Sequence, residues 1–227
     1  MPLDPDAQII LDAMIKAGRP AFETLTPVQA REQLHEMRAA LKQPQPAVAE
    51  VRNLSAGGPH GPIPLRLYRR RAATADRPQP LLMYFHGGGW VIGDIETHDN
   101  LCRSLANAAD CTVISVDYRL APEHKFPAAV DDCWAATTWV ADHAAELAVD
   151  RGRIAVGGDS AGGNLATVVS RLAAANGAPK IVYQVLPHAV HIARKVFLYP
   201  GAFPFLPDAG KQFLHHFFRQ QRVADHT

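Results

Sequence analysis

The chain has 227 residues, with 23 Lys and Arg against 22 Asp and Glu, so its net charge is +1. The length fits one α/β domain, and 48% apolar with 20% charged residues indicates a folded chain rather than a disordered one. Because the charge is balanced, we expect neither nucleic acid nor an anionic membrane as a partner.

The cysteine content and the N-terminal sequence indicate a reducing compartment inside the cell. The three cysteines, Cys102, Cys111 and Cys133, cannot all pair and are too few for a disulfide scaffold. The first 20 residues contain three aspartates and lack the basic start and long apolar run of a secretory signal. No stretch of about 18 apolar residues predicts a membrane span. We therefore expect a cytoplasmic location.

Two helices are expected within residues 1–45. Apolar residues recur at helical spacing between Ile10 and Ile15. The second helix has a defined start, with Thr26 as its N-cap, Pro27 at the first helical position and Gln29 three residues after the cap. This segment either packs as ordinary amphipathic helices or forms a lid over a site built further along the chain.

From residue 48 onward, strands alternate with helices. Short apolar runs are typical of strands buried on both faces. The expected strands cover residues 48–54, 64–68, 81–85, 112–116, 153–157 and 181–186, with a turn over 56–61. The expected helices cover residues 128–147 and 161–175, with Trp134 and Trp139 packing inward. This alternation predicts an α/β core with a mainly parallel sheet over residues 46–186.

The strongest chemical signal is the run GDSAGGN at residues 158–164, between an expected strand and an expected helix. Ser160 is flanked by Gly158 and Gly162 in the pattern of a nucleophile elbow. Such a turn projects the serine Oγ from the backbone, and the glycines let neighbouring backbone pass without a Cβ clash. The helix behind it offers free N–H groups and a positive dipole end to an oxyanion. The alternative is a glycine-rich loop that only turns or binds phosphate.

A second glycine motif, HGGGW at residues 86–90, directly follows the strand expected over 81–85. Three consecutive glycines expose backbone N–H groups that can point at one oxygen. Together with the N–H group after the nucleophile, they would form an oxyanion hole. His86 is expected to form structural hydrogen bonds, because a catalytic base must lie opposite the serine.

These two motifs and the run DYRLAPEHKFPAA at residues 117–129 resemble the bacterial hormone-sensitive-lipase-like carboxylesterases of the α/β-hydrolase fold. The resemblance covers residues 2–186. It implies hydrolysis of short- to medium-chain carboxylic esters, without a metal or a cofactor. The implied partner is a small-molecule ester, and the formation of a homo-oligomer stays open.

The resemblance also implies roles for individual residues. Ser160 is the implied nucleophile, and the backbone amides of Gly88, Gly89 and Ala161 form the implied oxyanion hole. The resemblance further implies that residues 1–45 belong to a helical cap that shapes the acyl pocket. Four further polar residues near the motifs are expected to be structural rather than catalytic: Asp117, Glu123, His124 and Asp159.

A serine triad also needs a histidine base and a carboxylate, which this fold places after the serine in the chain. In the family both lie further from the serine than Thr227 allows, and neither of their usual motifs is present. Residues 180–227 hold six of the nine Phe and five of the eleven His, but two of the 22 acidic residues. We therefore expect an atypical tail over residues 187–227 and a core without its last strands, as in a truncated or frame-shifted chain. A divergent C-terminus is the alternative.

The tail contains residues that could replace the missing triad members, but nothing in the sequence places them opposite Ser160. Without a base, a serine is a weak nucleophile at neutral pH. We therefore expect an ester hydrolase with weak or absent turnover. The alternatives are a catalytically dead remnant and a non-catalytic ligand-binding protein. The tail candidates are His188, His191, His215, His216 and His226, with Asp208 and Asp225.

Overall fold

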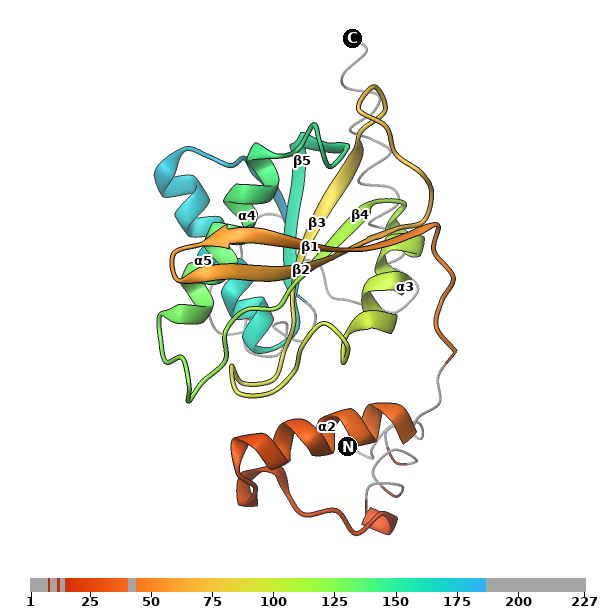
Figure 1. The fold of residues 1–227 in the computed structure, drawn as a ribbon, viewed down its shortest axis with the longest axis vertical. Coiled ribbons are helices and arrows are strands. Elements are labelled where there is room, and N and C mark those ends of the chain that lie inside the picture. Colours follow the sequence, from red (N-terminus) through yellow and green to blue (C-terminus); the bar gives the residue numbers. More distant parts are fainter. Residues whose placement is uncertain (1–7, 9–11, 13–14, 41–43, 187–227) are drawn as a thin grey trace.

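The structure of the chain is a computed structural model. It describes residues 8, 12, 15–40 and 44–186, which are coloured in Figure 1. The helix expected around Ile10 lies largely outside these residues, and so does the tail expected over residues 187–227. The expectation that the core lacks its last strands therefore stays a prediction.

A six-stranded sheet forms the centre of the described chain, with its strands in the order β1-β2-β4-β3-β5-β6 (Figure 1). Four neighbouring strands, β4, β3, β5 and β6, run parallel, and the hairpin of β1 and β2 extends the sheet with antiparallel pairs. The expected mainly parallel α/β core is confirmed. The strands are β1 (Glu50–Gly58), β2 (Gly61–Arg69), β3 (Gln79–Phe85), β4 (Thr112–Val116), β5 (Val149–Gly158) and β6 (Ile181–Val185).

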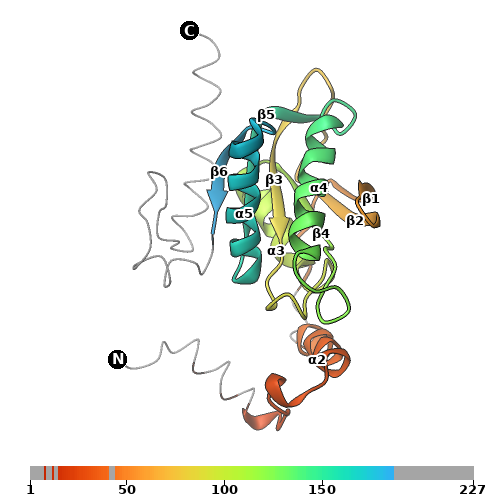
Figure 2. The ribbon, with the colours of Figure 1, turned by 90° about the vertical axis from the view of Figure 1, so that its left-hand side faces the viewer.

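Helices cover both faces of this sheet (Figure 2). Successive side chains of a strand point to opposite faces, and β3 shows the result. Leu81 and Met83 pack in one apolar cluster with α4 and α5, whereas Leu82 and Tyr84 pack in a second cluster with α3. The strand is therefore apolar throughout because both of its faces are buried. The helices are η1 (Phe22–Thr24), α2 (Pro27–Ala40), α3 (Asp99–Ala109), α4 (Ala128–Asp142) and α5 (Ala161–Asn176).

Several elements differ from the sequence expectation in their bounds; β5, for example, begins at Val149 rather than at residue 153. The turn expected over residues 56–61 is shorter, because the paired strands extend to Gly58 and Gly61 and leave a two-residue loop. The helix expected over 128–147 ends earlier, at Asp142.

Helix α3 is an element that the sequence pattern did not predict. Its sequence, DNLCRSLANAA, does carry apolar residues at helical spacing, but most of them are small. The buried positions recur at this spacing and pack against β4 and β2. They are Asp99, Cys102, Leu105, Ala106 and Ala109.

The start of α2 matches its prediction in atomic detail. The backbone N–H of Thr26 donates to Gln29 Oε1 over 3.0 Å, and the Gln29 N–H donates to Thr26 Oγ1 over 3.4 Å. This reciprocal pair is a capping box, which satisfies two backbone donors at the helix start. Figures 1 and 2 place α2 beyond the edge of the sheet at which the parallel strands end.

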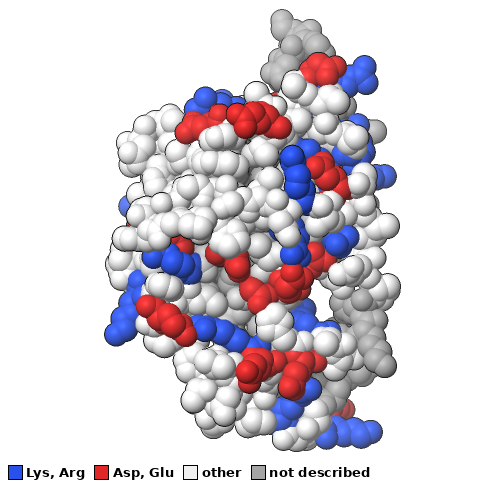
Figure 3. Space-filling model, in the orientation of Figure 1, with Lys and Arg blue, Asp and Glu red and all other residues white. Residues whose placement is uncertain are grey.

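Acidic and basic side chains are interleaved on the face shown in Figure 3, in agreement with a net charge of +1. The three cysteines are buried and free. Within the described ranges, no helix combines the length and the apolar character that crossing a membrane requires.

The packing of α5 on the sheet leads to a stability prediction. Leu165 is fully buried between α5 and the strands, so Leu165→Ala should lower the free energy of unfolding by about 2–5 kcal/mol through lost burial and a cavity. Leu101→Ala is the matched control, because Leu101 is 42% exposed and should change stability by less than about 0.5 kcal/mol. Urea unfolding curves of both variants measure the difference, and equal midpoints would contradict the assigned packing.

Candidate active site

Ser160 lies at the turn between β5 and α5, as the elbow pattern predicts. Its backbone angles are φ 52° and ψ −115°, a sparsely populated combination for a residue with a side chain. The residue is exposed, and its hydroxyl forms no hydrogen bond with the residues described. The predicted strained conformation at a strand-to-helix turn is therefore confirmed.

The glycines around Ser160 are required by close backbone contacts. A Cβ atom at Gly158 or at Gly162 would overlap the carbonyl oxygen of Phe85, at the end of the neighbouring strand β3. In the parallel register of these strands, Phe85 lies beside Gly158. The two glycines thus let the turn that carries Ser160 approach the loop that follows β3.

That loop is the second glycine motif, which we call the glycine loop (residues 86–90). It lies beside the serine turn, because the Gly87 N–H donates a hydrogen bond of 2.9 Å to Asp159 Oδ1. Gly88 and Gly89 both have positive φ angles, of 126° and 61°. Their N–H groups, and that of Ala161, donate no backbone hydrogen bond within the part of the chain that the structure describes. All three N–H groups therefore have no backbone acceptor among these residues.

Asp159 holds the two turns together. Besides the Gly87 amide, its Oδ1 accepts a hydrogen bond of 2.7 Å from the Tyr84 hydroxyl and lies 3.6 Å from His98 Nε2. Burial of the carboxylate opposes its ionisation, but the interactions with His98 and Tyr84 outweigh this and hold the pKa of Asp159 well below its usual range. The expected structural role of Asp159 is confirmed.

Tyr84 and His98 are partners that the sequence pattern did not single out. The only sign in the sequence is the hydroxyl of Tyr84 within an otherwise apolar strand, which needs a hydrogen-bond partner once buried.

His86 is also structural, as predicted. Its ring is fully buried and stacks on the ring of Tyr118, with 4.2 Å between centroids. Its Nδ1 lies 2.9 Å from the Gly87 carbonyl oxygen and therefore carries the proton. Burial lowers the pKa of His86 to about 4, so the ring is neutral at pH 7. Its Nε2 is buried and has no partner among the described residues, so it does not contact the Ser160 hydroxyl.

The other polar residues near the motifs have partners away from Ser160. Glu123 forms an ion pair of 2.7 Å with Arg31, whose hydrogen bond lowers the pKa of Glu123 to about 2. Burial, together with the nearby charge of Asp94, raises the pKa of Asp117 to about 6. Neither carboxylate orients a histidine toward Ser160, and the tail histidines lie outside the described residues.

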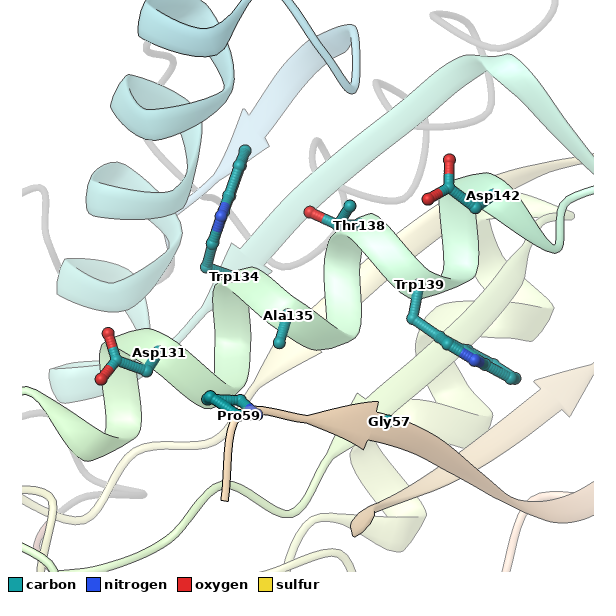
Figure 4. Close-up of a pocket in the computed structure, with 8 residues that line it drawn as sticks. All are labelled: Gly57, Pro59, Asp131, Trp134, Ala135, Thr138, Trp139 and Asp142. Atoms are coloured by element: carbon teal, nitrogen blue, oxygen red, sulfur yellow. The ribbon is translucent and has the colours of Figure 1, made fainter. Parts of the chain in front are cut away.

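A cavity of about 680 Å³ lies away from Ser160, beside α4 and the β1–β2 hairpin (Figure 4). Trp134 and Trp139, which were expected to pack inward, are half-buried on its wall, and their indoles point away from each other in Figure 4. Neither Ser160 nor the glycine loop contributes to this cavity. Its size is therefore no argument for a catalytic pocket. Its lining consists of Gly57, Pro59, Asp131, Trp134, Ala135, Thr138, Trp139 and Asp142.

Comparison with protein families gives a match over more than half of the chain. A sequence profile of the alpha/beta hydrolase fold matches residues 82–210. This range includes both glycine motifs and continues past Leu186, where the sequence resemblance was expected to end. The hypothesis of a shifted reading frame stays untested.

Individual relatives are esterases. Esterase LipI of Mycobacterium tuberculosis is 51% identical over 144 residues, which cover 63% of this chain and 45% of LipI. An arylesterase of Saccharolobus solfataricus is 43% identical over 176 residues, which cover 78% of this chain and 56% of the arylesterase. The solved structure of a hyperthermophilic esterase from Pyrobaculum calidifontis is similar with a TM-score of 0.74 and 43% identity, over 81% of this chain and 58% of that one. The chain thus spans about half the length of the curated relatives it matches.

Because the two turns are in close contact, adding a single methyl group at Gly162 should strongly lower the stability of the fold. Gly162→Ala should destabilise the fold by about 2–4 kcal/mol, because the new Cβ overlaps the Phe85 carbonyl group. Gly57→Ala is the control, since a Cβ at Gly57 meets no atom within 4 Å. Thermal unfolding should separate the two variants, and a Gly162→Ala chain as stable as the control would show that the turn is placed wrongly.

Asp117 makes stability depend on pH. Because its pKa is raised in the folded chain, the unfolded chain loses the Asp117 proton at a lower pH than the folded chain does. The contribution of Asp117 to stability therefore falls as pH rises from about 4 to about 6. Asp117→Asn should therefore raise stability at pH 7 by about 1–3 kcal/mol and leave it unchanged below pH about 4. Urea unfolding at several pH values tests this. The control Asp142→Asn changes a carboxylate that is 57% exposed and should alter stability at pH 7 by less than about 0.5 kcal/mol.

Proposed function

The chain belongs to the α/β-hydrolase family, and from this premise we propose that it hydrolyses carboxylic esters with Ser160 as the nucleophile. The resemblance to the hormone-sensitive-lipase-like carboxylesterases that its motifs indicated is confirmed. The observation that carries the proposal is the strained, exposed Ser160 beside a glycine loop that is hydrogen-bonded to its neighbour Asp159.

The proposed reaction is acyl transfer to Ser160. The Oγ atom attacks the ester carbonyl carbon, and the carbonyl oxygen becomes negatively charged. The free N–H groups of Gly88, Gly89 and Ala161 would donate hydrogen bonds to this oxygen and so stabilise the transition state. The alcohol then leaves, and water releases the acid from the acyl-serine.

This reaction needs a base to accept the Ser160 proton. Within the ranges that the structure describes, no histidine is hydrogen-bonded to the Ser160 hydroxyl. Losing the histidine of a serine triad costs a factor of about 10⁶ in kcat, while the oxyanion hole and substrate binding retain about 10³ over water. The second candidate function is therefore non-catalytic ester binding, favoured by the absence of a histidine partner for Ser160 among the described residues.

The proposal extends to the substrate and the organisation of the chain. We propose a small ester with a short- to medium-length acyl chain, in line with the esterase and arylesterase names of the relatives. Residues 1–45 would cap the site, residues 46–186 form the core, and residues 187–227 form an atypical tail. The position of α2 beyond the carboxyl ends of the strands supports a cap there. The buried free cysteines support a reducing, cytoplasmic location.

The direct test compares p-nitrophenyl acetate hydrolysis by the native chain and by Ser160→Ala. Removing the nucleophile should reduce any enzymatic rate by about 10³-fold or more. Ser104→Ala changes an exposed serine on α3 and should keep the native rate. Equal rates for the native chain and Ser160→Ala would exclude Ser160 as the nucleophile. If the native chain binds a ketone analogue of the ester in calorimetry but does not turn the ester over, the ligand-binding alternative holds.

A further inference from the structure

One arginine on α2 contacts two loops of the core, at Val91 just after the glycine loop and at Ala121 and Glu123. Arg31 Nε donates a hydrogen bond of 2.8 Å to the carbonyl oxygen of Val91, and its Nη2 donates one of 3.0 Å to the carbonyl oxygen of Ala121. Its two Nη atoms also bind the carboxylate of Glu123, over 3.0 Å and 2.7 Å. The guanidinium group therefore joins α2 to two segments that lie 60 to 92 residues further along the chain.

The geometry uses what an arginine offers and a lysine lacks. A planar guanidinium has five N–H donors in a fixed arrangement and can bind a carboxylate with two parallel hydrogen bonds. The Arg31 side chain is 27% exposed, so these bonds are partly shielded from water. Such a bidentate pair adds orientation as well as energy.

The Val91 carbonyl lies immediately after the glycine loop. Val91 N–H and Ile92 N–H both donate to the Gly88 carbonyl oxygen, over 3.1 Å and 3.0 Å. The Trp90 carbonyl oxygen accepts a hydrogen bond of 2.8 Å from Ala121 N–H. Arg31 thus binds the two segments, at Val91 and at Ala121, that hold this end of the loop in place.

The start of the loop is held independently, by the Asp159 carboxylate on the Gly87 N–H. Between the two anchors lie Gly88 and Gly89, which lack a Cβ atom, so that their backbone can adopt positive φ angles and has little conformational preference of its own. The direction of their free N–H groups therefore depends on the anchors at both ends.

Helix α2 depends on the same contacts. Of its 14 residues, Ala30 is the one that is buried, so apolar packing contributes little to holding the helix. The other polar contact between α2 and the core is the pair of His35 Nε2 and Asp94 Oδ2, at 2.6 Å. His35 follows Arg31 by one helical turn and contacts the same side of the core.

We propose that Arg31 is a positioning residue: its guanidinium fixes the far end of the glycine loop, and so the direction of the Gly88 and Gly89 N–H groups, to the position of α2. Arg31 itself touches no reacting atom. The inference rests on the proposed role of these amides in ester hydrolysis. The predicted effect of Arg31 on the position of the loop, however, does not depend on that role.

The first test is hydrogen exchange of the native chain and of three variants, measured by mass spectrometry. Arg31→Gln should raise the exchange rate in peptides covering residues 86–93 by about tenfold or more, because the loop opens more often. Glu123→Gln keeps the Arg31 hydrogen bonds to both carbonyl groups and should raise this exchange rate less than Arg31→Gln does. Arg19→Gln is the matched control, since it removes an exposed ion pair with Glu36 in the same N-terminal segment. Peptides from α5 should be unchanged in all three.

The second test is kinetic. With p-nitrophenyl acetate, Arg31→Gln should lower kcat by about tenfold while KM stays within about twofold, because the amides act on the transition state more than on the bound ester. Arg31→Lys should restore part of kcat, whereas a role in folding alone would change the amount of folded enzyme and leave kcat per folded molecule unchanged. Unfolding curves check that each variant is folded.

The outcomes separate this inference from the proposed function. Equal exchange over residues 86–93 in the native chain and in Arg31→Gln would overturn the inference, whether or not the chain hydrolyses esters. Faster exchange with an unchanged kcat in an active enzyme would also overturn it. If the native chain has no turnover but the loop of Arg31→Gln exchanges faster, the loop positioning is supported and the proposed function fails.

Discussion

The hydrogen bond from the Gly87 N–H to the Asp159 carboxylate joins the two glycine-rich turns of this protein. It can form because β3 and β5 are parallel neighbours, so that both turns leave the sheet at the same edge. It also requires glycine at the points of closest approach, where a Cβ atom would meet the Phe85 carbonyl group. The strained backbone of Ser160 is held between this contact and the start of α5.

The N-terminal helix is attached to this arrangement in a different way from the other helices. Helices α3, α4 and α5 bury apolar side chains against the sheet, whereas α2 contacts the core mainly through the polar side chains of Arg31 and His35. Burial of apolar surface is non-directional, but the hydrogen bonds of a guanidinium group depend on orientation. A segment held in this way adds little stability and fixes the position of the loops that it contacts.

The described residues include the proposed nucleophile, the exposed Ser160, and N–H groups on the neighbouring turns that donate no backbone hydrogen bond among these residues. The base that would activate the nucleophile is a separate requirement, because a neutral serine hydroxyl is a poor nucleophile. Family membership identifies the fold, and the chain spans about half the length of its curated relatives, so its chemistry is a proposal. For this reason hydrolysis and ester binding without turnover both follow from the same turn geometry.

The sequence by itself determined the features that depend on neighbouring residues. It predicted the buried strand over residues 112–116, the capped start of α2 at Thr26 and the turn at Ser160, because their patterns are local. It did not predict α3, whose buried residues recur at helical spacing but are mostly small. Nor did it predict the partners of Asp159 or the contacts of Arg31. These pairs lie between 60 and 92 residues apart, and only the packing of the strands and helices brings them within hydrogen-bond distance. Hydrogen bonds act over about 3 Å, so which of them form is decided by the tertiary structure rather than by the order of residues in the chain.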